Sequence, residues 1–131
     1  MNKYGEAAIR ATRYARATGT SATDAWTAAV RDAFPDSPSS QAKGCPRGAY
    51  LGLCEEGLVE GIPRGQYTRS KDNKAYALRA HGILQTEPAL SSSPDRLWDR
   101  VLAPISKKHN SQMDVVASLW NQGLLSKKDK S

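Results

Sequence analysis

Residues 43–48 of this chain read Lys-Gly-Cys-Pro-Arg-Gly and stand where a helix is expected to begin. The first turn of a helix presents backbone N–H groups without partners and the positive end of its dipole, so anions bind there readily. Two glycines permit a close backbone approach, and Lys43 and Arg47 add positive charge. The segment therefore predicts a phosphate or carboxylate site, although a tight turn shaped by glycine and proline explains the same residues equally well.

A second basic stretch runs from residue 64 to residue 79 and carries five basic side chains against one acidic one. Two tyrosines lie among these charges, and an aromatic ring beside basic groups can stack on a nucleic-acid base. Such basic density favours contacts with a phosphate backbone, but it is also common on solvated helix faces. From the two stretches we predict a set of anion- or nucleic-acid-binding residues: Lys43, Arg47, Arg64, Tyr67, Arg69, Lys71 and Lys74.

Cys45 offers a less favoured, catalytic interpretation. A thiol near a helix N-terminus, between Lys43 and Arg47, could have a lowered pKa and act as a nucleophile. It would need a base, and the only histidines are His81 and His109. Nothing in the spacing supports a Cys-His-Asn set, and two cysteines with two histidines form no zinc-binding pattern. We therefore predict no catalytic residue, no metal and no cofactor.

The charge balance indicates the kind of partner. The 131 residues include 19 basic and 13 acidic side chains, a net charge of +6, which favours nucleic acid or an acidic protein surface. No stretch approaches the roughly 20 apolar residues that span a bilayer, and the N-terminus has no apolar signal core. Cys45 and Cys54 stand on one expected helix, about 13 Å apart, too far for a disulfide. Free thiols fit a reducing compartment, so we expect a cytoplasmic protein without a membrane partner.

Apolar residues recur at helical spacing in six segments, and capping residues mark where most of these segments begin and end. The pattern predicts an all-α fold in one domain, residues 1–125, followed by a disordered basic tail, residues 126–131. Tyr14 is expected in the apolar stripe of the first helix. The solvent side of the third helix is expected to carry three glutamates, Glu55, Glu56 and Glu60.

The six helices can be read as two copies of a three-helix unit, at about residues 3–60 and 70–125. A serine cap stands five positions before Trp26 and again five positions before Trp98. Matching segments are offset by about 69, 72 and 66 residues in the three helices. A duplication suggests a pseudo-twofold packing that buries both tryptophans in a shared core. Six ordinary helices with common capping signals are the alternative.

Three segments of the chain, residues 43–57, 67–71 and 109–116, carry a family resemblance. They are similar to segments of an uncharacterised family of small bacterial all-helical proteins, and the resemblance covers nearly the whole chain. It implies a bacterial cytosolic protein. It brings no activity, cofactor or catalytic residue.

These features together favour a non-catalytic binding module whose basic surface engages nucleic acid or another phosphate-bearing partner. The alternative is a protein–protein adaptor or inhibitor that uses the same surface on an acidic protein. An enzyme built around Cys45 is the third interpretation. Salt-sensitive binding to nucleic acid would favour the first, and rapid alkylation of Cys45 near neutral pH would favour the third.

Overall fold

The computed structural model describes residues 2–103 and 107–126, and helices make up most of that length. The frame consists of six helices of nine residues or more: α1 (Lys3–Thr18), α2 (Ala22–Ala33), α4 (Gly44–Glu55), α5 (Lys71–Thr86), α6 (Pro94–Leu102) and α7 (Gln112–Asn121). Two shorter elements lie in the connections, α3 (Pro38–Gln41) and the 3-10 helix η1 (Pro88–Ser92). The predicted all-α fold is confirmed.

Local sequence explains where several helices begin and end. The hydroxyls of Ser21 and Ser93 each accept the backbone N–H three residues further on, so these serines cap α2 and α6. Gly57 and Gly123 end the last helix of each predicted half with φ values of 72° and 71°, a left-handed conformation that glycine adopts readily. In both places the N–H of the following leucine donates to a carbonyl five residues back, at 3.2 and 2.9 Å.

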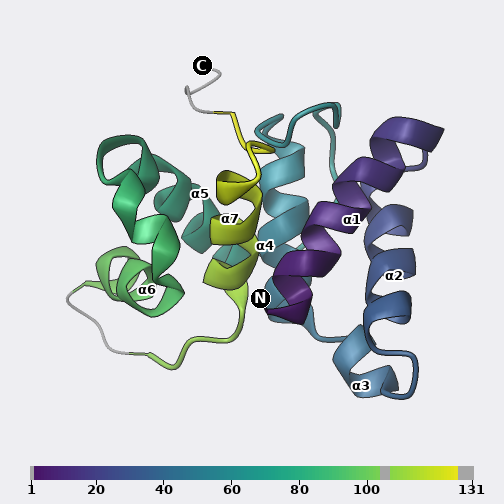
Figure 1. Ribbon diagram of the computed structural model, residues 1–131, viewed down its shortest axis with the longest axis horizontal. Coiled ribbons are helices and arrows are strands. Elements are labelled where there is room, and N and C mark those ends of the chain that lie inside the picture. The colour runs from purple at the N-terminus through teal and green to yellow at the C-terminus, as the bar shows by residue number, and fades with distance from the viewer. Residues whose placement is uncertain (1, 104–106, 127–131) are drawn as a thin grey trace.

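The helices are arranged around a central pair, α4 and α7, with α1 and α2 on one side and α5 and α6 on the other (Figure 1). α1 packs against α7, and α5 packs against α4. The first helix of each predicted half therefore lies against the last helix of the other half. One continuous cluster of buried side chains joins the two sides and includes Trp26 and Trp98, as predicted.

The segments that follow α4 and α7 pair with each other. Residues 58–60 run antiparallel to residues 124–126, with an isolated bridge between Val59 and Leu125. Two backbone hydrogen bonds of 2.8 Å flank this bridge, from the N–H of Glu60 to Leu124 and from the N–H of Ser126 to Leu58. The two bonds are equivalent under a shift of 66 residues, because Glu60 then corresponds to Ser126 and Leu58 corresponds to Leu124. The duplication stays a prediction, and this pairing has the symmetry that a duplication would leave.

Two sequence predictions differ from the fold. Tyr14 is 47% exposed, whereas the buried face of α1 consists mostly of small side chains such as Ala8 and Ala11. Of the predicted tail, residues 126–131, only Ser126 is described, and it is buried rather than disordered. Residues 127–131 lie outside the described part of the chain, as do residues 104–106, which include Pro104, a residue that the sequence predicts to kink or end the fifth helix.

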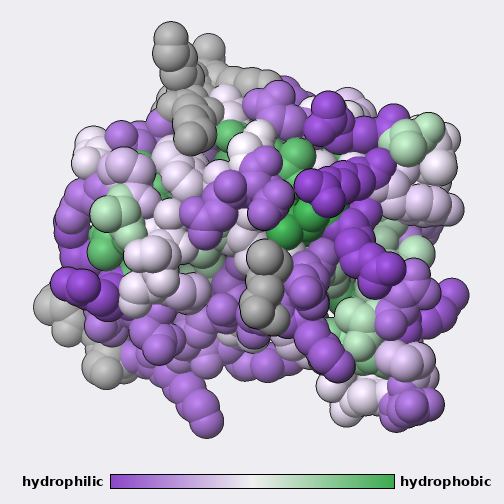
Figure 2. Space-filling model, in the orientation of Figure 1, coloured by the Kyte–Doolittle hydropathy of each residue, from purple (hydrophilic) through white to green (hydrophobic). Residues whose placement is uncertain are grey.

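Hydrophilic side chains cover most of the face seen in Figure 2, and apolar residues show only in small areas. Within the described residues, Tyr14 is the large apolar side chain that is exposed. No helix in the described part of the chain combines the length and the apolar character that crossing a membrane requires.

Candidate functional site

Five of the seven predicted binding residues lie near the crossing of α5 and α4. Gly52 of α4 lies directly against α5: a Cβ added there would stand 2.6 Å from Cβ and 2.7 Å from Cα of Lys74. Gly48, one turn earlier, is similarly close to Ser70, at 2.9 Å. Because any side chain would collide at these positions, glycine permits the close approach of the two helices. The crossing places Arg47 of α4 beside the segment that leads into α5.

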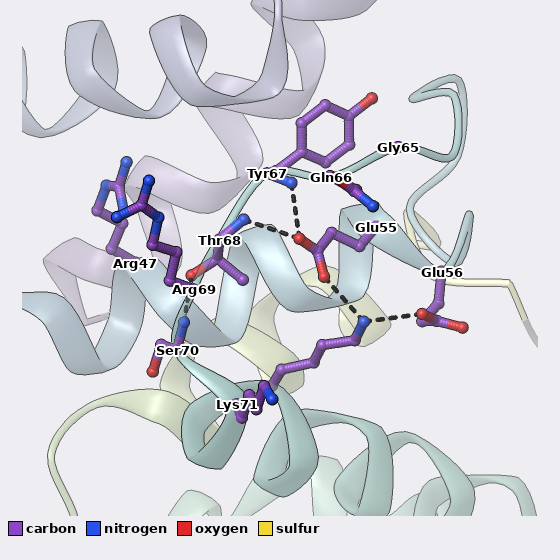
Figure 3. Close-up of a pocket in the computed structure, with 11 residues that line it drawn as sticks. Arg47, Glu55, Glu56, Gly65, Gln66, Tyr67, Thr68, Arg69, Ser70 and Lys71 are labelled. Atoms are coloured by element: carbon purple, nitrogen blue, oxygen red, sulfur yellow. Dashed lines mark hydrogen bonds and ion pairs between the residues drawn. The ribbon is translucent and has the colours of Figure 1, made fainter.

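Glu55 fastens this segment to the end of α4. One carboxylate oxygen accepts the N–H groups of Tyr67 and Thr68 at 2.6 and 2.8 Å, and the other accepts Nζ of Lys74 at 2.8 Å (Figure 3). Burial raises the pKa of the Glu55 carboxyl, but the hydrogen bonds from Lys74, Thr68 and Tyr67 outweigh burial and hold the pKa below its usual range. The side chain is only 9% exposed, so the predicted position on the solvent side is wrong for Glu55.

A surface hollow of about 780 Å³ lies beside this fastening, and we call it the first hollow. Its lining includes five of the seven predicted binding residues: Arg47, Tyr67, Arg69, Lys71 and Lys74. Lys74 is already paired, because its Nζ lies 2.8 Å from both Glu55 and Glu56. Arg64 does not line the hollow and lies 3.7 Å from Glu56. Two of the predicted cations therefore already lie within ion-pair distance of a glutamate.

Three cations remain at the first hollow. In residues 2–103 and 107–126, no carboxylate lies within ion-pair distance of Arg47, Arg69 or Lys71. Figure 3 shows Arg47 and Arg69 at one end of the hollow, away from Glu55 and Glu56. The remaining predicted residue, Lys43, lies elsewhere, with Nζ 5.3 Å from the centre of the Tyr4 ring. Three of the predicted cations, Arg47, Arg69 and Lys71, thus line the first hollow without a carboxylate partner among the described residues.

A second hollow, of about 470 Å³, lies on the other side of residues 69–71. Its lining adds Lys107 and Lys108, which the sequence prediction missed, together with Cys45 and Tyr76. The one sequence signal for these lysines is that they are adjacent. Lys107 and Lys108 are distant from residues 69–71 along the chain, and no sequence pattern predicts that these residues lie close together. Among the described residues, Asp72 is the only carboxylate residue in this lining.

The geometry does not favour catalysis by Cys45. Its sulfur accepts a weak hydrogen bond from Nδ2 of Asn110 at 3.6 Å. The Nε2 atom of His109 accepts the backbone N–H of Met113 at 3.1 Å, and Nδ1 lies 3.8 Å from the carboxylate of Asp114. His109 therefore caps α7, and its basic nitrogen is occupied. His81 is buried, with Nε2 2.6 Å from the carbonyl of Ser126.

We expect His109 to titrate below its usual pKa of about 6.5. Burial lowers the pKa of His109 and outweighs the nearby Asp114 carboxylate, which raises it. The unfolded chain then takes up this proton at a higher pH than the folded chain does. The stability that the neutral ring contributes is complete above about pH 6.5 and is lost as the pH falls through the folded-state pKa. NMR titration of the imidazole would measure the midpoint. Asp114→Asn should lower it further, and a midpoint at or above the usual value would contradict this account.

The described residues contain no group of three or more His, Cys, Asp or Glu side chains placed to hold a metal ion. Fold and site together define a small all-helical protein with two basic surface hollows beside the crossing of α4 and α5. The chain belongs to the family of unknown function DUF6979, whose family model matches residues 1–126. This agrees with the resemblance to an uncharacterised family. No curated protein and no solved structure matches the chain.

Proposed function

We propose that this protein is a non-catalytic binding module that engages the phosphate groups of a nucleic acid. The observation that carries the proposal is the convergence of Arg47, Arg69 and Lys71 on the first hollow without a carboxylate partner among the described residues. The same surface continues past residues 69–71 to Lys107 and Lys108 in the second hollow.

Unpaired cations close together repel one another, so this cluster gains free energy when an anion lies between them. Two of them are arginines, whose planar guanidinium groups bind phosphate oxygens through two parallel hydrogen bonds. Lys74 and Arg64 differ from these three cations, because each already lies within ion-pair distance of a glutamate. Five cations in two adjoining hollows suit a repeating phosphate backbone better than a single carboxylate.

The proposal is tested by salt dependence. Affinity for a nucleic acid should fall steeply between about 50 and about 200 mM salt, because phosphate contacts release bound counterions. Arg69→Ala combined with Lys71→Ala should weaken binding at least tenfold at low salt and reduce the slope of log K against log salt by about 2. Fluorescence polarisation with a labelled oligonucleotide measures both quantities.

A charge-matched control is available on the other side of the molecule. Arg10 and Arg31 are exposed on α1 and α2 and line neither hollow. Arg10→Ala combined with Arg31→Ala removes the same net charge and should leave the salt slope unchanged. Equal weakening by both double variants would mean that binding follows net charge and not this site. No salt-sensitive binding at all would overturn the proposal and leave the predicted acidic protein partner.

A further inference from the structure

The two hollows share one wall, and each contains a tyrosine. Residues 69–71, which we call the ridge, line both hollows. Tyr67 lines the first hollow and Tyr76 lines the second. Each hollow therefore has one tyrosine in its lining, and the two hollows share the ridge that carries Arg69 and Lys71.

Contacts with the fold hold both rings. The hydroxyl of Tyr67 donates to the carbonyl of Pro63 at 2.6 Å. The Tyr76 ring meets Trp98 edge-on, with 5.1 Å between ring centres. Nζ of Lys107 lies 5.4 Å from the centre of the Tyr76 ring and donates to its hydroxyl at 3.3 Å. Both tyrosines are nevertheless partly exposed. A ring that is already fixed loses little conformational entropy when a base stacks on it, so the two tyrosines are suited to stacking.

The hollows have the size and the polar groups that a nucleotide requires. Volumes of about 780 and 470 Å³ lie within the range of pockets for small ligands. Gln66 and Thr68 line the first hollow and Asn110 lines the second, so amide and hydroxyl groups are available to base edges. In a duplex the bases are paired and stacked inside the helix. A duplex could touch the ridge with its phosphates but would leave both hollows empty.

We propose that the hollows receive unpaired bases of a single-stranded nucleic acid whose phosphate backbone crosses the ridge. This inference rests on the proposed function, because it takes the phosphates to bind at Arg47, Arg69 and Lys71. Tyr67 and Tyr76 act as stacking platforms, and the preference for single strands comes from them. The cations alone bind either form of nucleic acid.

The first test compares two forms of one probe. A fluorescein-labelled oligothymidylate about 12 nucleotides long is measured alone and as a duplex with its complement, at the same low salt. The single strand should bind at least tenfold more tightly, although the duplex carries more charge. Equal affinities, or tighter binding of the duplex, overturn this inference and leave the proposed function standing. No binding of either form overturns both.

Variants of the tyrosines test their role in stacking. Tyr67→Leu and Tyr76→Leu should each weaken single-strand binding about tenfold and leave duplex binding unchanged, since stacking on one ring contributes about that factor. Tyr67→Phe and Tyr76→Phe keep the ring and should retain most of the affinity. Tyr14→Leu is the control, because Tyr14 is exposed on α1 and lines neither hollow. Loss of affinity in the phenylalanine variants as well would overturn stacking as the cause.

The unmodified protein provides a probe that does not depend on how a variant folds. Cys45 lines the second hollow and is partly exposed, whereas Cys54 is buried and burial raises the pKa of its thiol to about 12. At saturating concentration the oligothymidylate should slow alkylation of Cys45 at least fivefold, and the duplex should not. Alkylation that is unchanged by a bound single strand would show that the second hollow stays empty.

Discussion

Replacement of Glu55 by alanine is expected to lower the free energy of unfolding by about 3 kcal/mol, because three hydrogen bonds to one carboxylate are lost together. The N–H groups of Tyr67 and Thr68 would lose their acceptor, and Lys74 would keep only its contact with Glu56. The segment that carries Arg69 would then lose its side-chain hydrogen bonds to α4. Nucleic-acid affinity should therefore fall as well, although Glu55 carries the same charge as the ligand. Urea denaturation measures the stability, and hydrogen exchange at the Tyr67 and Thr68 amides reports the release of the segment.

The neighbouring glutamate is a matched control for this change. Glu56 also contacts Lys74, at 2.8 Å, but its side chain is 39% exposed and accepts no backbone N–H among the hydrogen bonds of the described residues. Ion pairs on the surface contribute little, so Glu56→Ala should cost less than about 1 kcal/mol. Both variants remove one negative charge. If the two variants destabilised the protein equally, the lost negative charge would explain the effect of Glu55→Ala. The lost hydrogen bonds to the Tyr67 and Thr68 amides would not.

Gly52→Ala is expected to destabilise the protein by about 1–3 kcal/mol, although alanine favours helix formation more than glycine does. The added Cβ would stand 2.7 Å from Cα of Lys74, a backbone atom that cannot rotate away. α5 would have to move off α4, and the ridge would move with it. Thermal or urea unfolding measures the cost, and reduced affinity for the single-stranded probe would report the displaced ridge.

Gly82 supplies the control for this helix substitution. It lies within α5, and a Cβ there would meet nothing within 4 Å. Gly82→Ala should therefore stabilise the protein by about 0.5–1 kcal/mol, because alanine loses less backbone entropy on folding. Opposite signs for the two variants are the expected result. Similar stabilisation by both would mean that α4 and α5 are not in close contact at Gly52.

The binding residues show how far sequence reasoning reaches. The expected helix start at residues 43–48 selected Arg47, and basic density with interleaved aromatics selected Tyr67, Arg69 and Lys71. The structure brings these four residues to one hollow. The same density also selected Lys74 and Arg64, which lie against glutamates. Charge along a sequence does not reveal which cations already have a partner. Glu55 was missed for the same reason, since a glutamate at a helix end resembles any solvated side chain until its three donors are in place.

The rest of the site could not be predicted from the sequence, because its residues are far apart along the chain. Lys107 and Lys108 reach the second hollow because α5, α6 and α7 pack together, and no periodicity in the sequence connects them with residues 69–71. In the sequence, Gly48 indicated only backbone freedom at a helix start, and Gly52 gave no signal. In the structure both glycines allow α5 to pack closely against α4. The packing of α1 against α7 and of α5 against α4 is equally invisible in local patterns.

By itself, the sequence determined the helices and where most of them begin and end, because helical periodicity, serine caps and left-handed glycines act over a few residues. It also determined that positive charge gathers between residues 64 and 79. The tertiary structure alone decided which of these cations remain unpaired and which residues from distant segments join them. The physical reason is that ion pairing and hollow formation depend on contacts between elements, whereas propensity and capping depend on neighbours along the chain.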